Sequence, residues 1–244
     1  DACNGIASYQ SATGSGTYTY DSAGNLTGST AKNSGGAIIR VTTIDYDGDN
    51  HPLTQTGVSA ANMTQTFTYD GDGIRRSENN DGAVTNFVWD GSNVLQERAA
   101  SGTLTAQYTN WPGVWGTLIS QRRGSVTTWF NSDNQMNVRT LTNAACTVTD
   151  RYQYEAFGEE LSISGSTANP FRYGGAVGYY RDFAETYYVR MRSYWAALAQ
   201  WSTRDPIAYG GGDYNLYRYV GNDPTGRVDP SGLSQDMGGG KCTV

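Results

Sequence analysis

The chain has 244 residues, of which 37% are hydrophobic, 12% aromatic and 16% charged, with a formal net charge of −6. The 18 Tyr and 6 Trp provide enough aromatic surface for a sizeable core, which argues against simple disorder. Basic residues are scattered with no run longer than two, no apolar run reaches about 18 residues, and His51 is the one histidine. We therefore expect no nucleic-acid surface, no membrane span and no multi-histidine metal site.

The first two thirds of the chain repeat one pattern, in which an aromatic residue is followed by Asp or Asn and then by Gly or Asn. The aromatic suits a strand end, the Asp or Asn can bond the backbone two residues on, and Gly or Asn supplies a positive φ. This pattern predicts one β-hairpin per repeat, and we find no helix of ordinary length before residue 175. The seven copies lie 19 to 26 residues apart, at Tyr20, Tyr46, Tyr69, Trp89, Tyr108, Phe130 and Tyr154.

Within the second repeat, Asp45, Asp47 and Asp49 resemble the start of a calcium loop. Thr56 stands at the twelfth position, where such a loop requires Glu, so we favour acids that shape a turn over a metal site. His51 precedes Pro52 in the same turn, and we expect a turn histidine there rather than a catalytic one.

The three cysteines, Cys3, Cys146 and Cys242, are far apart and form no C-x-x-C pair. Their odd number leaves at least one thiol free or paired outside the chain. Two alternatives stay open: all three are unpaired, or one disulfide forms, such as Cys3 to Cys146. Scarce Lys with abundant Gly, Thr, Asn and Tyr favours a secreted or cell-surface protein.

From Phe171 the sequence changes into an ordered series of motifs. The series resembles the RHS-associated core domain, and the upstream repeats resemble the YD repeats of the RHS family. That family includes bacterial polymorphic toxins, C components of insecticidal toxin complexes and teneurins. The motifs are Phe171-Arg172-Tyr173-Gly174-Gly175, Tyr187-Tyr188-Val189-Arg190-Met191-Arg192, Arg204-Asp205-Pro206, Asn215-Leu216-Tyr217-Arg218-Tyr219 and Asp229-Pro230-Ser231-Gly232-Leu233.

The resemblance implies an all-β fold, in which antiparallel hairpins form a sheet that spirals into a hollow shell or barrel. We expect YD repeats over 1–170, a loop-rich core domain over 171–233 that closes one end, and a flexible tail over 234–244. Because Ser193–Trp201 departs from the family pattern, we expect a short helix there. Such a module would hold or display a protein cargo, or pair with other copies of itself through strand edges, without a cofactor.

In the toxin members of the family, the core domain cuts its own chain just after the Asp-Pro-x-Gly-Leu motif. The resemblance thus implies a scissile bond between Leu233 and Ser234, with Asp205 and Asp229 as carboxylates and Arg204 beside the first. Two close carboxylates cannot both ionise, so one can hold a proton while the other activates water.

Three alternatives to this assignment stay open. Both aspartates can serve only to shape Asp-Pro turns. Asp213 and Asp223 are alternative partners for Asp205. A third hypothesis for the whole chain is an adhesin whose exposed aromatic residues bind carbohydrate.

Overall fold

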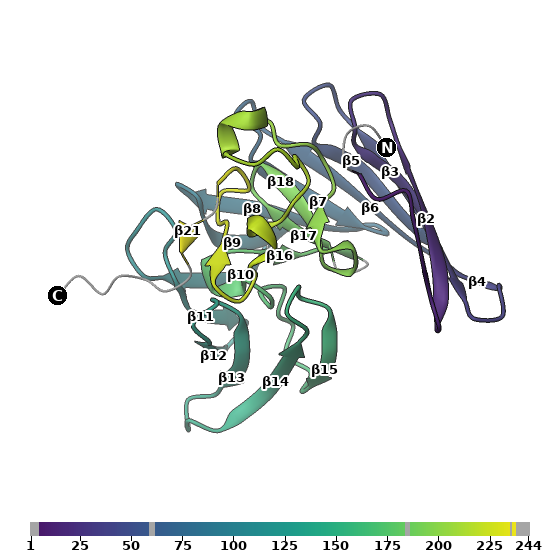
Figure 1. Cartoon of the computed structure of the whole chain (residues 1–244). Helices are drawn as coiled ribbons and strands as arrows, with labels where there is room; N and C mark the ends of the chain where they lie inside the picture. The colour runs from purple at the N-terminus through teal and green to yellow at the C-terminus, as the bar shows by residue number, and fades with distance from the viewer. Residues whose placement is uncertain (1–4, 59–61, 184–185, 235, 238–244) are drawn as a thin grey trace.

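The computed structural model describes residues 5–58, 62–183, 186–234 and 236–237, and one antiparallel sheet dominates it (Figure 1). Fifteen strands follow in chain order, each hydrogen-bonded to the next. The predicted all-β fold is confirmed, and the described residues contain no α-helix. The strands are β1 (Ser8–Ser11), β2 (Gly14–Tyr20), β3 (Leu26–Asn33), β4 (Ile38–Tyr46), β5 (Pro52–Val58), β6 (Asn62–Tyr69), β7 (Arg75–Asn80), β8 (Ala83–Asp90), β9 (Asn93–Ala99), β10 (Leu104–Asn110), β11 (Leu118–Arg123), β12 (Val126–Ser132), β13 (Val138–Thr142), β14 (Val148–Tyr154) and β15 (Glu160–Ser164).

Each repeat lies where an even-numbered strand turns into the next strand, as the pattern predicts. In the β4–β5 turn, Oδ1 of Asp47 accepts the N–H of Asp49 at 2.9 Å and that of His51 at 2.8 Å. Asp70 and Asp133 hold their turns in the same way. A positive φ occurs at Gly or Asn in most of these turns, whereas in the turn after β12 it falls on Met136, at 64°.

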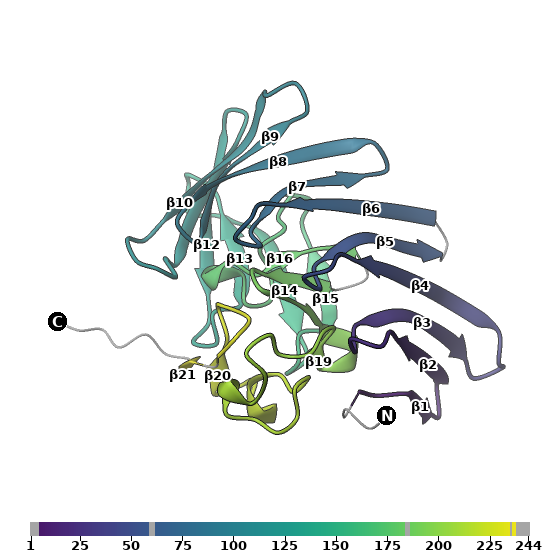
Figure 2. The same cartoon turned by 90° about the horizontal axis from the view of Figure 1, so that it is seen from above.

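The strands that carry the repeats also bend the sheet. Every even-numbered strand from β2 to β14 has a register shift near its C-terminal end, next to the repeat aromatic or its equivalent. Such bulges increase strand twist and bend the strand. Figure 2 shows the result, a sheet that curls around the C-terminal segment. The order of strands stays linear from β1 to β15, so the sheet is an open spiral and not a closed barrel.

At four of the repeats, the aromatic side chain joins its hairpin to the preceding one. The hydroxyl of Tyr46 donates to the carbonyl of Leu26 at 3.0 Å, and that of Tyr69 to Pro52 at 2.9 Å. The indole N–H of Trp89 donates to the carbonyl of Arg75, and the hydroxyl of Tyr154 donates to the carbonyl of Val138. Each acceptor is the first residue of the strand after the previous repeat turn, so at these four repeats the polar end of the aromatic ties one hairpin to the one before it.

The C-terminal segment contains short strands, 3-10 helices and loops, and it packs against the repeat turns at one end of the sheet. Arg190 donates from Nε to Ser92 in the β8–β9 turn at 2.8 Å, and the Tyr217 hydroxyl donates to Gly24 in the β2–β3 turn at 2.6 Å. Its elements are η1 (Gly175–Val177), β16 (Tyr180–Arg181), β17 (Thr186–Val189), β18 (Arg192–Trp195), η3 (Ala196–Leu198), β19 (Gln200–Trp201), η4 (Ala208–Gly211), η5 (Val220–Asn222), β20 (Arg227–Val228) and β21 (Asp236–Met237).

The short helix expected over Ser193–Trp201 is wrong. β18 and β19 form an antiparallel pair there, with Tyr194 opposite Trp201, and only the three-residue η3 connects them. The large aromatics of this stretch are buried on both faces, and strands present such side chains to two packing partners more readily than one helical turn does.

The interior is rich in tyrosine, as the composition indicates. One cluster lies within the C-terminal segment, and a second joins that segment to the middle strands of the sheet. The first contains Tyr173, Tyr179, Tyr187, Tyr194, Trp201 and Tyr219, and the second contains Phe87, Tyr108, Phe171, Tyr180 and Tyr188.

The predictions on the cysteines and on the C-terminal tail concern residues of which the structure describes only some. Cys146 is a free, exposed thiol, while Cys3 and Cys242 lie outside the described residues. Most of the tail predicted to be flexible, residues 235 and 238–244, also lies outside them.

Candidate functional site

Asp205 is positioned by the turn that follows β19. Its N–H donates to the carbonyl of Leu216 at 3.0 Å, which ties the two sides of the loop together. Its Oδ1 accepts the N–H of Ile207 at 3.0 Å, and its carbonyl accepts that of Ala208 at 2.9 Å. Pro206 between them presets the backbone for such a turn. Oδ2 of Asp205 therefore remains available to other groups.

Asp229 lies in a tighter turn, immediately before the predicted scissile bond. Its Oδ1 accepts the hydroxyl of Ser231 at 2.8 Å, the N–H of Gly232 at 2.8 Å and the N–H of Leu233 at 3.2 Å. The φ of 75° at Gly232 is one that glycine adopts without strain. The turn folds Leu233 and Ser234 back over the Asp229 carboxyl group.

Arg192 brings the two carboxyl groups together from the start of β18. Its Nη2 lies 3.0 Å from Oδ2 of Asp205 and 3.5 Å from Oδ2 of Asp229, and its Nε donates to the carbonyl of Gly232. The guanidinium also lies over the Trp201 ring, 4.2 Å from the centroid, and the side chain is only 4% exposed. One buried cation thus serves two carboxyl groups and the backbone next to the predicted scissile bond.

Burial dominates the electrostatics of this site. It raises the pKa of Asp205 and the pKa of Asp229 above their usual range, although the Arg192 charge and local hydrogen bonds oppose the rise. Burial also lowers the pKa of Arg192 against the pull of both carboxylates. A single guanidinium favours ionisation of one carboxyl group at a time, so the site suits one carboxylate and one carboxylic acid.

A small cavity of about 30 Å³ connects these groups with the predicted scissile bond. Its walls include Arg192, Asp205, Asp229, Leu233 and Ser234. A water molecule needs roughly 10–15 Å³ of such volume, so the cavity has room for one or two.

Gly211 forms part of the same cavity wall. A Cβ there would lie 2.9 Å from Oδ2 of Asp205 and 3.5 Å from the Leu233 carbonyl oxygen, so the carboxylate and the carbonyl both approach Gly211 closely.

The structure places the other sequence candidates around this centre. Arg204 lies against Gly24 in the β2–β3 turn, where a Cβ would overlap its guanidinium, and the arginine on both carboxylates is Arg192. Asp213 lines the cavity but pairs with Arg218 at 3.2 Å. Asp223 pairs with Arg227 at 3.7 Å. The sequence analysis did not single out Arg192. A signal was present, because Arg190 and Arg192 lie in an otherwise apolar stretch, and a buried arginine needs acidic partners.

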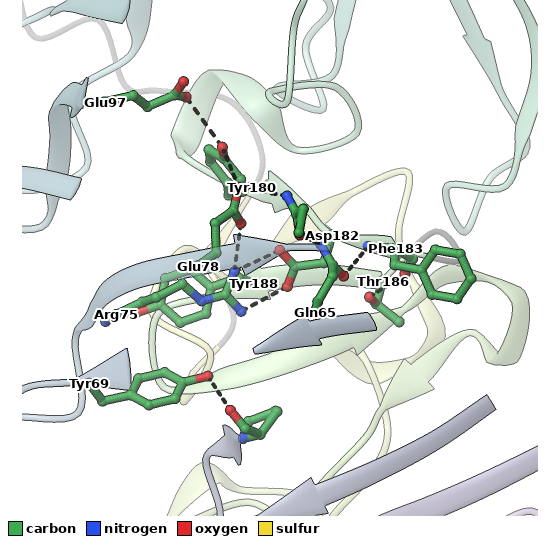
Figure 3. A network of polar contacts seen from close by, with 12 residues as sticks. Gln65, Tyr69, Arg75, Glu78, Glu97, Tyr180, Asp182, Phe183, Thr186 and Tyr188 are labelled. Atoms are coloured by element: carbon green, nitrogen blue, oxygen red, sulfur yellow. Dashed lines mark hydrogen bonds and ion pairs between the residues drawn. The ribbon is translucent and has the colours of Figure 1, made fainter. Parts of the chain in front are cut away.

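A second polar network holds the C-terminal segment to the middle of the sheet (Figure 3). Arg75 at the start of β7 forms a bidentate pair with Asp182, with N–O distances of 2.6 and 2.8 Å. Its guanidinium lies between the rings of Phe67 and Tyr188, 4.0 and 4.1 Å from their centroids. Arg75 is 1% exposed, so the sheet and the segment bury this ion pair together.

Two glutamates extend the network across the sheet. The hydroxyl of Tyr180 lies 3.3 Å from Oε1 of Glu78 and 3.3 Å from Oε1 of Glu97. Glu97 forms an ion pair with Arg123, whose Nη1 lies 2.9 Å from Oε2 of Glu97. Glu78 lies 3.8 Å from Arg75, whose charge Asp182 already shares. Burial, followed by the negative charge of Asp182, raises the pKa of Glu78 to about 7, although Arg75 opposes the rise.

Neither network offers a metal centre. Among the described residues, no group of three or more His, Cys, Asp and Glu side chains is arranged to hold a metal ion. His51 lies in the β4–β5 turn, as expected, where its Nδ1 is 3.1 Å from Asp47 and its ring stacks on Tyr69. No helix in the described ranges is both long and apolar enough to cross a membrane.

Comparison with known proteins finds relatives that are much longer than this chain. The tRNA nuclease WapA of Bacillus subtilis is 27% identical over 224 residues, which cover 88% of this chain and 8% of WapA. The double-stranded DNA deaminase toxin A of Burkholderia cenocepacia is 28% identical over 249 residues, covering 89% of this chain and 17% of the toxin. The chain thus spans less than a fifth of either relative. No protein-family model matches it.

Solved structures share the fold. The crystal structure of TcdB2-TccC3 superposes with a TM-score of 0.61 and 14% identity, over 90% of this chain and 14% of that one. The Photorhabdus luminescens Tc holotoxin pore superposes with a TM-score of 0.61 and 16% identity, over 91% and 13%. The long curled sheet and its C-terminal segment are therefore found in much larger assemblies.

Proposed function

We propose that this chain belongs to the RHS/YD-repeat family and forms the end of a hollow β-sheet shell that holds a protein cargo. Its similarity to the two longer relatives and to the solved structures supports the proposal. The curled sheet is a section of the shell wall, and the C-terminal segment is a plug across one end. Since one relative is a toxin by name, we place the shell in a secreted or surface-exposed protein.

The observation that carries this proposal is the way the plug engages the repeat turns. Contacts reach turns from the beginning, the middle and the end of the sheet: Tyr217 to Gly24, Arg190 to Ser92, and Gln135 to Thr225. A segment bonded to turns spread along the sheet holds the curl in place, as a wall around a lumen requires.

Protease protection tests this function in the full protein, which includes whatever the gene encodes on either side of this chain. Cargo enclosed by the shell should resist proteinase K until the shell is denatured. Arg190→Ala removes bonds to Ser92 and to Val177, and it should admit the protease at lower denaturant concentration. The exposed Arg122→Ala is the matched control. Cargo that is digested at once in the native, unsubstituted protein contradicts encapsulation.

A second function, self-cleavage between Leu233 and Ser234, is supported by the Asp205–Arg192–Asp229 arrangement. Asp205 is the carboxylate, because it lies closer to Arg192, and it removes a proton from water in the cavity. Asp229, 3% exposed and farther from Arg192, holds the proton that the leaving amine takes. The C–N bond breaks, the hydroxyl forms a carboxylic acid at Leu233, and Ser234 becomes a free amino terminus.

Intact-mass measurement of the purified chain tests the second function. The unsubstituted chain should separate at Leu233–Ser234, whereas Asp205→Asn should remain whole. Asp213→Asn is the matched control, because Asp213 lines the same cavity but is paired with Arg218. An unsubstituted chain that stays intact to Val244 over days rules the reaction out. The encapsulating function does not depend on this result.

A further inference from the structure

The side chain of Ser231 connects the acid of this site with the nitrogen of the predicted scissile bond. Its Oγ lies 2.8 Å from Oδ1 of Asp229. On the other side, the N–H of Ser234 points to the same Oγ at 3.2 Å, and the N–H of Leu233 at 3.0 Å. Ser231 thus touches both the proton donor and the atom that must receive a proton when the bond breaks.

We propose that Ser231 is a catalytic residue of the self-cleavage, which relays the proton of Asp229 to the Ser234 nitrogen. The inference rests on the second proposed function. An amide nitrogen is a poor leaving group until it is protonated, and a positioned proton donor contributes roughly 10²–10⁴-fold to such reactions. A hydroxyl is suited to a relay because it donates one proton while its lone pairs accept another.

The relay is balanced. When water adds to the Leu233 carbonyl, the Ser234 nitrogen becomes pyramidal and its lone pair turns towards Oγ of Ser231. Oγ gives its proton to that nitrogen and takes the proton of Asp229 in the same step. Asp229 ends as a carboxylate, stabilised by the N–H groups of Gly232 and Leu233 and by Arg192. Asp205 ends protonated, so proton exchange with solvent restores the pair.

The geometry also explains why Asp229 needs an intermediary. Its Oδ1 accepts two backbone N–H groups, and its Oδ2 faces Arg192, so both oxygens are already oriented by other partners. In the resting turn the Ser231 hydroxyl donates to that Oδ1. The relay therefore begins when the hydroxyl rotates about its Cβ–Oγ bond towards the Ser234 nitrogen and accepts the Asp229 proton instead, while the backbone and Arg192 contacts of the carboxyl group stay in place. The turn thus keeps the carboxyl group fixed while the hydroxyl moves the proton.

The test compares the cleavage rates of four chains by intact mass: unsubstituted, Ser231→Ala, Ser231→Thr and Ser202→Ala. Ser231→Ala should slow cleavage about 100-fold, and Ser231→Thr, which keeps the hydroxyl, should stay within roughly threefold. Ser202 is a buried serine whose hydroxyl donates to the Ser193 carbonyl at 3.0 Å, so Ser202→Ala controls for the loss of a structural hydrogen bond.

A solvent deuterium isotope effect separates a relay from a structural role. The unsubstituted chain should cleave more slowly in D₂O, and this effect should shrink in Ser231→Ala because the two relayed protons are no longer in flight. Equal rates for Ser231→Ala and the unsubstituted chain overturn the relay alone. A slow Ser231→Ala with an unchanged isotope effect overturns it too. An unsubstituted chain that never cleaves overturns the relay together with the self-cleavage.

Discussion

Glu78 should make the stability of the protein fall as pH rises through the weakly acidic range. Its side chain is 5% exposed, Asp182 shares its cation, and the Tyr180 hydroxyl links it to Glu97. The folded protein therefore holds a proton on Glu78 up to about pH 7, whereas the unfolded chain releases it near 4.5. Between these two values the folded state binds more protons, so the free energy of unfolding falls with pH.

The magnitude follows from the pKa difference. A rise from 4.5 to about 7 corresponds to about 3 kcal/mol, at roughly 1.4 kcal/mol per pKa unit. Glu78→Gln keeps the shape and stays neutral at every pH, so its stability should not carry this loss. Relative to the unsubstituted protein, the variant should gain about 3 kcal/mol between about pH 4.5 and about pH 8.

Urea unfolding followed by tryptophan fluorescence, repeated across that pH range, measures the difference. Other carboxyl groups contribute equally to both proteins, so subtracting the two curves isolates Glu78. The exposed Glu155→Gln should run parallel to the unsubstituted protein. If the Glu78→Gln curve also runs parallel to it, the reasoning about the buried network is refuted.

Three further predictions concern stability, each checked by urea unfolding at neutral pH. Asp182→Asn leaves the Arg75 cation buried without its main partner and should cost about 3–5 kcal/mol; a loss below about 1 kcal/mol contradicts a buried pair. Gly57→Ala would drive a Cβ into the Phe183 ring and should cost about 1–3 kcal/mol, whereas Gly48→Ala, with open space around it, should change stability by less than about 0.5 kcal/mol. Equal effects at the two glycines would show that Phe183 does not pack on Gly57. Tyr154→Phe removes the hydroxyl bond to Val138 and should cost about 1 kcal/mol. Tyr209→Phe, at an exposed tyrosine, is its control and should be neutral.

The repeat hairpins could be predicted because their signals are local. Asp47 and Asp70 close their turns with their own backbone, and Gly24 and Gly73 supply the positive φ, so a few adjacent residues determine each turn. Met136 shows the limit of such rules. Its φ of 64° is imposed by the Asp133 turn and the packing around it, although methionine does not favour that conformation.

The sequence also indicated Asp205, Asp229 and the Leu233–Ser234 bond as one site, through motifs that lie 24 residues apart. It did not indicate Arg192, which reaches both carboxyl groups only because the β17–β18 hairpin lies beneath the two Asp-Pro turns. It placed Arg204 beside Asp205 in the chain, but the side chains of sequence neighbours can point to opposite sides, and Arg204 lies against Gly24.

By itself, then, the sequence determined the hairpin repeat, the all-β class and the positions of the two Asp-Pro turns, because each depends on contacts within a few residues. Only the tertiary structure decided what those elements surround. The bulges beside the repeat turns add up to a curl, and the curl brings Arg75 of the sheet to Asp182, 107 residues later. Ion pairs across such separations depend on the cumulative twist of many strands, which no local pattern encodes.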